Sequence, residues 1–255
     1  MTIIDQMHRS VTLTDYPPKR IVSTVPSQTE LLFYLGLDEE VVGITKFCVH
    51  PREQFRAKKK IGGTKQLKLE EIAALNPDLI IGNKEENQQE QMEWLMERFP
   101  VWMSDIYNLS DATAMIRSVS QLVGKELSGA ALAQQISDSF KDLACIKPRK
   151  TAYLIWKGPY MAAASDTFID HIMGWGGLEN VFSEKKRYPA VTLTQLKDAS
   201  PELLLLSSEP YPFKQRHVEE FQQELPNTKV MLVDGELFSW YGNRLLQTAD
   251  YLKRL

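Results

Sequence analysis

LEEIAALNPDLIIG, residues 69–82, has the layout of a short helix, a turn and a buried strand. LTQLKDASPELLLLSS, residues 193–208, repeats that layout, with Ser-Pro-Glu in place of Asn-Pro-Asp before the aliphatic run. A proline one or two residues after a helical segment prevents the helix from continuing. A short continuous aliphatic run indicates a strand that is buried on both faces. A unit repeated roughly half a chain apart is typical of two similar lobes, whereas solenoid repeats recur every 20–50 residues or so.

Strand and helix patterns alternate around the first copy of this unit. An aliphatic strand at residues 21–25 is followed by a helix, and a second strand is expected at residues 41–45. Ser27 and Glu30 have the spacing of a capping box at the start of that helix. Alternating helices and continuous apolar strands predict parallel sheets covered on both faces.

The alternation restarts late in the chain. Residues 126–146 keep helical spacing, and no Pro- or Gly-rich linker interrupts them. We therefore expect an α/β protein with two similar lobes, each a parallel sheet flanked by helices. The predicted lobes are residues 1–124 and 148–255, and one long helix at residues 125–147 joins them.

Composition narrows the classes of function. The chain has 255 residues, 43% of them hydrophobic and 25% charged, and a net charge of -3. This balance argues against nucleic acid as a partner, because a nucleic-acid-binding surface is usually basic. The two cysteines, Cys48 and Cys145, fall in different predicted lobes and form no CxxC pair, so no disulfide or zinc site is expected. Nothing suggests an obligate oligomer, and we expect a monomer.

The N-terminal stretch MTIIDQMHRSVTLTDYPPKR has no apolar core and no small-residue cleavage site. It is therefore not a signal peptide, and no apolar run is long enough to span a membrane. As the sequence stands, a cytoplasmic protein is expected. If a signal peptide has been removed, the protein would be periplasmic or at the cell surface.

Five stretches together resemble a known family. They are RIVSTVPSQTELLFYLGLDEEVVGIT, LEEIAALNPDLIIG, GWGGLENVF, ASPELLLLSS and FSWYGNRLL. In this order and spacing they are similar to ABC-transporter substrate-binding proteins of the helical-backbone class, and most of all to the vitamin B12-binding branch. The resemblance implies two α/β lobes bridged by a long helix, and a corrinoid, heme or ferric siderophore held between the lobes. It implies no required cofactor and no catalytic residue.

The resemblance places the ligand against loops at the carboxyl ends of the strands, where open α/β sheets bind their ligands. Aromatic residues there would offer rigid stacking area, and basic residues would meet polar groups of the ligand. The expected ligand-binding residues are Ser27, Gln28, Phe47, His50, Asn83, Lys84, Trp156, Lys157, Tyr188, Trp240, Tyr241 and Arg244.

Two of these residues have alternative interpretations. His50 could contact a metal, with Cys48 two residues away, but a histidine before a proline is more often a loop residue, and no metal site is predicted. Arg244 either faces the ligand or pairs with a local acid at the start of the last helix.

Two features depart from the family pattern. The resemblance implies docking on a transporter through one acidic residue of each lobe. Glu70 matches the first position, but Thr194 stands at the second, which weakens the expected docking. Thr64 and Asn83 stand where the vitamin-binding relatives carry tryptophans, so the floor of the site is expected to be more polar.

Three functions therefore remain open. The first is a binding protein for a metal-bearing small molecule in ABC-type uptake. The second is a cytosolic carrier or sensor that reuses the fold. The third is an enzyme. The sequence has no Walker A, GxSxG, HExxH or GxGxxG motif, so enzymatic activity is not expected.

Overall fold

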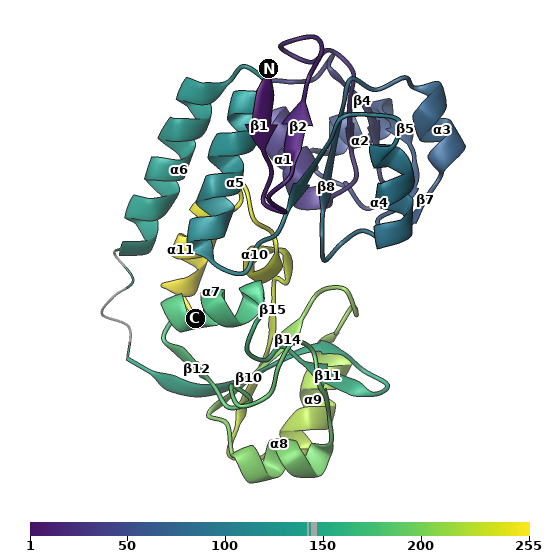
Figure 1. Cartoon of the computed structure of the whole chain (residues 1–255). Coiled ribbons are helices and arrows are strands. Elements are labelled where there is room, and N and C mark those ends of the chain that lie inside the picture. Colours follow the sequence, from purple (N-terminus) through teal and green to yellow (C-terminus); the bar gives the residue numbers. More distant parts are fainter. Residues whose placement is uncertain (142, 144–146) are drawn as a thin grey trace. The chain divides into compact units, whose positions relative to one another are not determined.

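The computed structural model describes residues 1–141, 143 and 147–255, and these form two compact units. Unit 1 comprises Met1–Ile106, Ser110–Ile136 and Tyr241–Arg244. Unit 2 comprises Tyr107–Leu109, Ser137–Trp240 and Leu245–Leu255. Each unit has its own sheet and its own helices (Figure 1), so both halves of the chain fold as α/β structures.

Unit 1 is built on a five-stranded sheet in which every pairing is parallel, with the strand order β5-β4-β3-β8-β9. Two short antiparallel hairpins, β1–β2 and β6–β7, accompany the sheet. In chain order the elements are β1 (Thr2–Ile4), β2 (Ser10–Thr12), β3 (Ile21–Ser23), α1 (Pro26–Tyr34), β4 (Val41–Ile44), α2 (Arg52–Ala57), β5 (Lys59–Lys60), β6 (Gly62–Gly63), β7 (Gln66–Leu67), α3 (Leu69–Ala74), β8 (Leu79–Asn83), α4 (Gln89–Met96), β9 (Val101–Ser104), α5 (Leu109–Leu122) and α6 (Glu126–Lys141).

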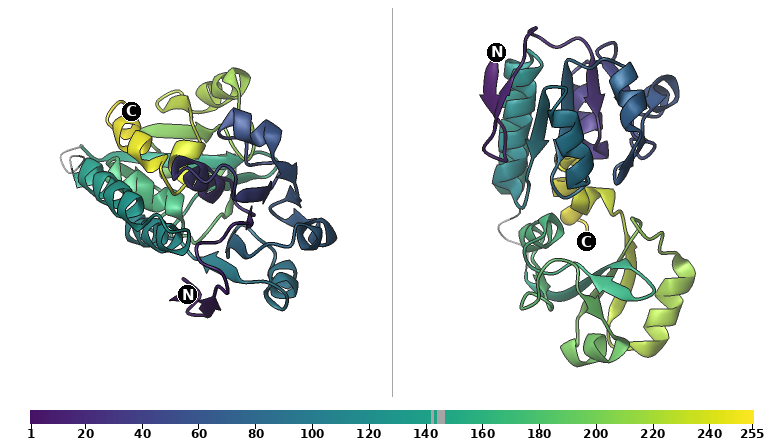
Figure 2. Two further views of the ribbon diagram at one scale, coloured as in Figure 1. Left: turned by 90° about the horizontal axis from the view of Figure 1, so that it is seen from above. Right: turned by 45° about the vertical axis from the view of Figure 1, so that its right-hand side comes forward.

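Helices lie on both faces of this sheet, as its continuous apolar strands predict. Val22 and Ile80 of the central strands pack in one cluster with Ile72 of α3 and Leu95 of α4. α5 and α6 run side by side (Figures 1 and 2). Their contact requires a glycine, because a Cβ at Gly129 would lie 1.9 Å from Oγ of Ser120.

Unit 2 has a six-stranded sheet with the order β13-β11-β10-β14-β15, and β12 also pairs with β10. β12, β14 and β15 run parallel to their neighbours, as the sequence predicts, and β11 and β13 add an antiparallel edge. The elements are β10 (Arg149–Trp156), β11 (Tyr160–Ala162), α7 (Phe168–Trp175), β12 (Leu178–Asn180), β13 (Ala190–Val191), α8 (Leu193–Ala199), β14 (Leu203–Ser207), α9 (Gln215–Glu224), β15 (Lys229–Val233), α10 (Glu236–Ser239) and α11 (Leu245–Leu252).

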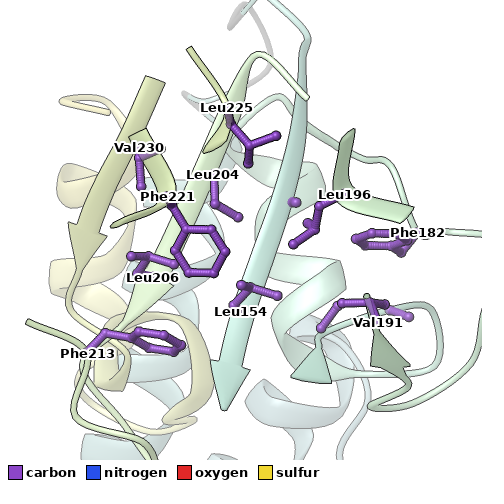
Figure 3. Packing of buried hydrophobic residues seen from close by; sticks show 13 residues of the cluster. Leu154, Phe182, Val191, Leu196, Leu204, Leu206, Phe213, Phe221, Leu225 and Val230 are labelled. Carbon is purple, nitrogen blue, oxygen red and sulfur yellow. The ribbon is translucent and has the colours of Figure 1, made fainter. Parts of the chain in front are cut away.

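The strand residues of unit 2 alternate between two buried faces. Leu154 of β10 and Leu206 of β14 belong to a cluster that includes Phe221 of α9, and Figure 3 shows these side chains on one side of the sheet. Tyr153, next along β10, lies against Phe238 of α10 with ring centroids 4.9 Å apart. Successive side chains of a strand point to opposite faces of the sheet. Because both faces of this sheet are covered, nearly every residue of β10 and β14 in the core is apolar.

Two helices, α1 and α8, begin in different ways: α1 has no side-chain cap, and α8 has a capping box. α1 begins with Pro26 at its first turn and Val25 as N-cap, and no side chain caps it, so the predicted capping box of Ser27 and Glu30 is wrong. α8 does have a capping box: Oγ1 of Thr192 accepts from the Gln195 N–H at 3.1 Å, and Oε1 of Gln195 accepts from the Thr192 N–H at 2.9 Å.

The predicted linking helix at residues 125–147 corresponds in part to α6, which ends at Lys141. The boundary between the units falls inside this helix, after Ile136. Residues 142 and 144–146 of the prediction, Cys145 among them, lie outside the described residues. Within the described part of the chain, no helix combines the length and the apolar character that crossing a membrane requires.

Candidate functional site

Buried polar side chains line the carboxyl edge of the sheet in unit 1. Asn83 ends β8, and its amide nitrogen donates to Oγ of Ser104, which ends β9, at 2.9 Å. The amide nitrogen of Gln28 donates to the same hydroxyl at 2.5 Å. Asn83 and Gln28, two of the predicted ligand-binding residues, therefore lie close together. Both are buried, and both donate their amide N–H groups to Ser104 inside the unit.

Asn87 connects this edge to the loop before it. Its Oδ1 accepts from Oγ1 of Thr24 and from the backbone N–H of Asn83, both at 2.9 Å. Its Nδ2 donates to the carbonyl of Thr64 at 3.1 Å. Thr64 and Asn83, from which a more polar floor is expected, both take part in a hydrogen-bonded network that stabilises the edge of the sheet, Thr64 through its backbone carbonyl.

Cys48 lies at the neighbouring strand end and is fully buried. Its Sγ is 3.1 Å from the hydroxyls of Thr29 and Thr45. Desolvation raises the pKa of the thiol, so the group stays protonated and neutral. This thiol is occupied by two hydroxyl contacts and gives no support to a metal shared with His50.

Arg244 pairs with Glu30 of α1 inside unit 1. Its Nε and Nη2 donate to the two carboxylate oxygens at 2.9 and 2.8 Å. Both side chains are close to nine-tenths buried, so the pair is desolvated as well as bidentate. The acid is 214 residues away in sequence, which corrects the expectation of a local partner.

The residues before Arg244 are fixed in the same unit. Tyr241 is buried, and Gly242 has φ +148°, where a Cβ would come within 3.1 Å of the Ser27 carbonyl oxygen. Ser27 is itself buried at the first turn of α1. Of the predicted ligand-binding residues, Ser27, Tyr241 and Arg244 therefore contribute to the packing of α1 against the Tyr241–Arg244 segment.

The predicted loop residues after β4 and β8 are more accessible. Phe47 is half exposed, and its ring lies over Gly63, where a Cβ would be 3.0 Å from the ring. His50 is partly buried in the same loop. Lys84 is exposed, and its ammonium group is 2.6 Å from the carboxylate of Asp105. These three side chains could meet a ligand without disrupting the core.

Unit 2 also has an accessible aromatic residue among the predicted ones, Trp156, the last residue of β10, which keeps 40% of its surface exposed. Its ring meets Tyr211 edge to face at 5.6 Å. The next residue, Lys157, forms an ion pair with Glu220 of α9, and this contact lowers the pKa of the Glu220 carboxyl group. Aromatic surface and a positive charge therefore lie together at this strand end.

Tyr188 lies on the segment between α7 and α8, partly buried. The guanidinium of Arg187 stands 5.4 Å from its ring centroid and 5.9 Å from that of Tyr107. Arg187 has φ +60°, a backbone conformation that non-glycine residues rarely adopt. Backbone bonds of 2.8 and 2.9 Å to Ser165 and Ala164 hold it there.

Trp240 is buried beneath a carboxylate. Its Nε1 donates to Oε1 of Glu209 at 2.8 Å, and the hydroxyl of Ser239 donates to the same oxygen at 3.0 Å. Desolvation raises the pKa of Glu209, and the charges of Glu236 and Asp234 raise it further. Trp240 is thus fixed in unit 2 by a carboxyl group that the sequence did not single out.

The two copies of the repeated unit place the predicted docking positions alike. Glu70 and Thr194 are each the second residue of their helix, α3 and α8, and both are exposed. In α8 the neighbouring Gln195 folds back into the capping box. The first helix therefore presents an acid where the second presents only a hydroxyl.

Two surface hollows lie away from these residues. One of about 550 Å³ lies beside α7 in unit 2, lined by residues that include Asp170, His171 and Trp175. The other, of about 330 Å³, lies beside the β1–β2 hairpin in unit 1 and includes Arg9 and Arg98. Across residues 1–141, 143 and 147–255, no three His, Cys, Asp or Glu side chains gather in a way that could hold a metal ion.

Sequence reasoning missed four residues that shape the site: Glu30, Asn87, Glu209 and Tyr211. Glu209 and Tyr211 follow directly on the second repeat, in SSEPYPFK, residues 207–214. A polar and aromatic run at the carboxyl end of a buried strand is the signal that could have identified them. Asn87 and Glu30 carry no such signal, because their partners are distant in sequence.

Comparison with known proteins identifies the family and the fold of the chain. The model of the periplasmic binding protein family matches residues 21–228. The vitamin B12-binding protein of Vibrio parahaemolyticus serotype O3:K6 is 26% identical over 207 residues, which cover 78% of this chain and 74% of that protein.

Two solved structures share the fold. The periplasmic vitamin B12 binding protein BtuF of Vibrio cholerae matches with a TM-score of 0.80 at 21% identity, over 92% of this chain and 95% of that one. The periplasmic heme-binding protein RhuT from Roseiflexus sp. RS-1, in apo form, matches with a TM-score of 0.81 at 24% identity, over 92% and 97%. The prediction of a two-lobed α/β fold of this class is confirmed.

Proposed function

The chain belongs to the periplasmic binding protein family, and from this we propose that it is a substrate-binding protein for a metal-bearing small molecule in ABC-type uptake. The ligand classes are a corrinoid, a heme or a ferric siderophore. The observation that carries the proposal is the match over most of the chain to proteins named for binding vitamin B12 or heme. A family of binding proteins also gives no support to the enzyme hypothesis.

Accessible side chains at the strand ends support the ligand class. Phe47 of unit 1 and Trp156 of unit 2 each offer exposed aromatic surface at the carboxyl end of a strand. Lys157 follows Trp156 directly in sequence, and Lys84 follows β8 in the same unit as Phe47. Aromatic area with a few charged groups suits a large conjugated ring that carries polar substituents.

Titration of the purified protein with hemin, cyanocobalamin and a ferric hydroxamate siderophore tests the proposal. Tryptophan quenching and the visible absorbance of each compound give two independent readouts. Saturable binding at micromolar or lower concentration is expected for one class. Failure of all three compounds to bind would contradict the proposal.

No protein ligand to the metal is part of the proposal. Cys48 contacts Thr29 and Thr45, and within residues 1–141, 143 and 147–255 no three His, Cys, Asp or Glu side chains gather to hold a metal ion. Metal-free protoporphyrin should therefore bind about as tightly as hemin, and His50→Ala should leave the absorbance of bound hemin unchanged. A loss of the hemin band in the variant would assign His50 to the metal.

A membrane permease is the proposed partner, and Glu70 is the proposed contact. Because Thr194 carries no charge at the equivalent position, electrostatic guidance should come from unit 1 alone. Cells that take up the identified ligand through this protein should lose uptake with Glu70→Gln and gain it with Thr194→Glu. Equal uptake by all three proteins would remove both residues from the interface.

The uncharged Thr194 of α8 favours a second candidate function, a cytosolic carrier or sensor of the same ligand. A carrier that never meets a permease has no need of an acid at position 194. Fractionation of cells separates the two candidates, since the uptake protein should be found outside the cytoplasmic membrane and the carrier inside it.

A further inference from the structure

Trp156 is exposed, yet its ring has a defined position. It ends β10 in unit 2, and its indole meets Tyr211 edge to face with centroids 5.6 Å apart and planes at 69°. The backbone N–H of Tyr211 donates to the carbonyl of Ile155 at 3.3 Å. The segment after β14 is therefore attached to the end of β10, and it carries the ring that supports the indole.

Tyr211 is in turn held by a buried pair of rings. Phe213 lies 4.8 Å from it and His217 5.6 Å, and these two rings are 5.4 Å apart. Nδ1 of His217 accepts from the Lys214 backbone N–H at 2.9 Å, and its Nε2 lies 3.3 Å from Nε of Arg216 and 3.5 Å from the Tyr211 hydroxyl.

The imidazole of His217 stays neutral in this setting. Burial lowers its pKa, and the neighbouring charges of Lys157 and Arg216 lower it further, against the opposing charge of Glu220. Lys214 also acts to lower it. A neutral, buried ring can pack against Tyr211 and Phe213 without a desolvated charge, and these ring contacts hold Tyr211 against Trp156.

A basic residue follows the indole in sequence. Lys157 follows Trp156 directly, and its ammonium group pairs with Glu220, one turn along α9 from His217. The Lys157 side chain keeps 28% of its surface exposed. An exposed aromatic ring next to a lysine complements a flat ring that carries carboxylate groups.

We propose that Trp156 is the stacking surface for a flat tetrapyrrole ring, and that Tyr211 and His217 are positioning residues that fix its plane. This inference rests on the proposed function and deepens it, because it selects the tetrapyrrole class over the hydroxamate siderophores, which have no such ring. Rigid aromatic surface offers contact area at a low cost in conformational entropy, and Trp156 is the ring of unit 2 that has this support.

Hemin binding by four variants tests the inference. Trp156→Ala should weaken hemin affinity about tenfold, and Tyr211→Leu about threefold, whereas Tyr211→Phe keeps the ring and should bind like the unchanged protein. Tyr160→Leu is the matched control, because the Tyr160 ring packs on Phe221 at 5.0 Å in the same unit, whereas the Trp156 ring meets Tyr211. It should leave hemin affinity unchanged.

A spectroscopic readout separates positioning from general damage to the fold. With 5-fluorotryptophan in the protein, the resonance that disappears in Trp156→Phe is that of Trp156. This resonance should shift or broaden in Tyr211→Leu, return in Tyr211→Phe, and stay in place in Tyr160→Leu. His217→Gln should shift it in the same direction as Tyr211→Leu, by a smaller amount.

The outcomes divide cleanly. If the unchanged protein binds none of the three probe compounds, the proposed function fails and the inference with it. If hemin binds and Trp156→Ala binds it equally well, the proposed function stands and the stacking role is overturned. If Tyr211→Leu leaves the Trp156 resonance and hemin affinity unchanged, the positioning role is overturned.

Discussion

Arg244 and Glu30 form a bidentate ion pair inside unit 1, although 214 residues separate them in sequence. The pair joins the Tyr241–Arg244 segment to α1. On both sides of that segment the chain belongs to unit 2, so four residues return to unit 1 and are fastened there by one arginine. The ion pair and the close approach of Gly242 to Ser27 both hold this stretch in unit 1.

Removal of Arg244 should be costly because it leaves a carboxylate buried without a partner. Arg244→Ala is expected to lower the free energy of unfolding by about 3–5 kcal/mol, measured by urea denaturation. The double variant Glu30→Leu/Arg244→Met should lose less than Arg244→Met alone, since no charge is then left unpaired.

Lys197→Ala provides the control, because Lys197 and Glu224 form an exposed ion pair at 2.6 Å. An exposed pair contributes about 1 kcal/mol or less. Equal losses for Arg244→Ala and Lys197→Ala would contradict the view that burial makes the first pair important.

Two helical glycines should respond in opposite directions to alanine. A Cβ at Gly129 in α6 would lie 1.9 and 2.2 Å from Oγ and Cβ of Ser120, whereas a Cβ at Gly174 in α7 would meet nothing within 4 Å. Gly129→Ala should destabilise by about 1–3 kcal/mol, because overpacking exceeds the gain in helix propensity. Gly174→Ala should stabilise by up to about 1 kcal/mol. Thermal unfolding of both variants gives the comparison.

Ser120→Gly should rescue Gly129→Ala, since it removes the side chain that the new methyl group meets. If the double variant is no more stable than Gly129→Ala, the close contact between α5 and α6 is not the cause of the loss.

Asn87 should be sensitive because three hydrogen bonds end on its amide group. Asn87→Ala leaves the Thr24 hydroxyl, the Asn83 N–H and the Thr64 carbonyl without this partner in a buried place. A loss of about 2–4 kcal/mol is expected in urea denaturation, since each unsatisfied buried group costs about 1–3 kcal/mol and the cavity allows partial relaxation. Faster amide hydrogen exchange at Asn83 should accompany it.

Gln89→Ala is the matched comparison for Asn87, because the Gln89 amide is exposed and meets only Glu93 among its hydrogen bonds in the described chain. It should change stability by less than about 0.5 kcal/mol. A similar loss in both variants would mean that the Asn87 network contributes nothing special.

Glu209 should make stability depend on pH in a sense opposite to that of a salt-bridged acid. Desolvation raises its pKa in the folded protein above the value in the unfolded chain, about 4.3. The folded state then binds more protons than the unfolded state between these two values. Its contribution to stability is present below the unfolded pKa and is lost as pH rises through the folded pKa.

Glu209→Gln removes this titration and keeps an oxygen that can accept from Trp240 and Ser239. The melting temperature of the variant, relative to the unchanged protein, should rise between pH 4 and pH 7 or so. A difference that stays constant with pH, or that falls, would show that Glu209 does not titrate as its burial implies.

The fold could be predicted because its signals are local. Apolar runs such as Leu203–Leu206 mark buried strands, and the repeated helix–turn–strand unit marks two similar halves. The prediction failed where side-chain pairing overrode local chemistry. Ser27 and Glu30 have capping-box spacing, but Pro26 starts the helix and the acid pairs with Arg244.

Prediction of the site was limited for a related reason. Gln28 and Asn83 were chosen as polar residues after strands, and the structure directs their amide nitrogens to Ser104. Trp156 was chosen by position, but Tyr211, which supports it, lies 55 residues later by the numbering and has no periodic signal. The sequence predicts that a residue lies at a strand end, but it does not predict which distant side chain contacts that residue.

The sequence by itself determined the alternation of strands and helices, the two similar halves and the identity of the strand ends that carry polar and aromatic residues. These follow from hydrophobic periodicity and from proline and glycine chemistry, which act over a few residues. Only the tertiary structure decided which of the polar residues are occupied inside each unit. Burial removes water as a partner, so Glu30, Gln28 and Trp240 must bind the groups that folding brings to them, however distant those groups are along the chain.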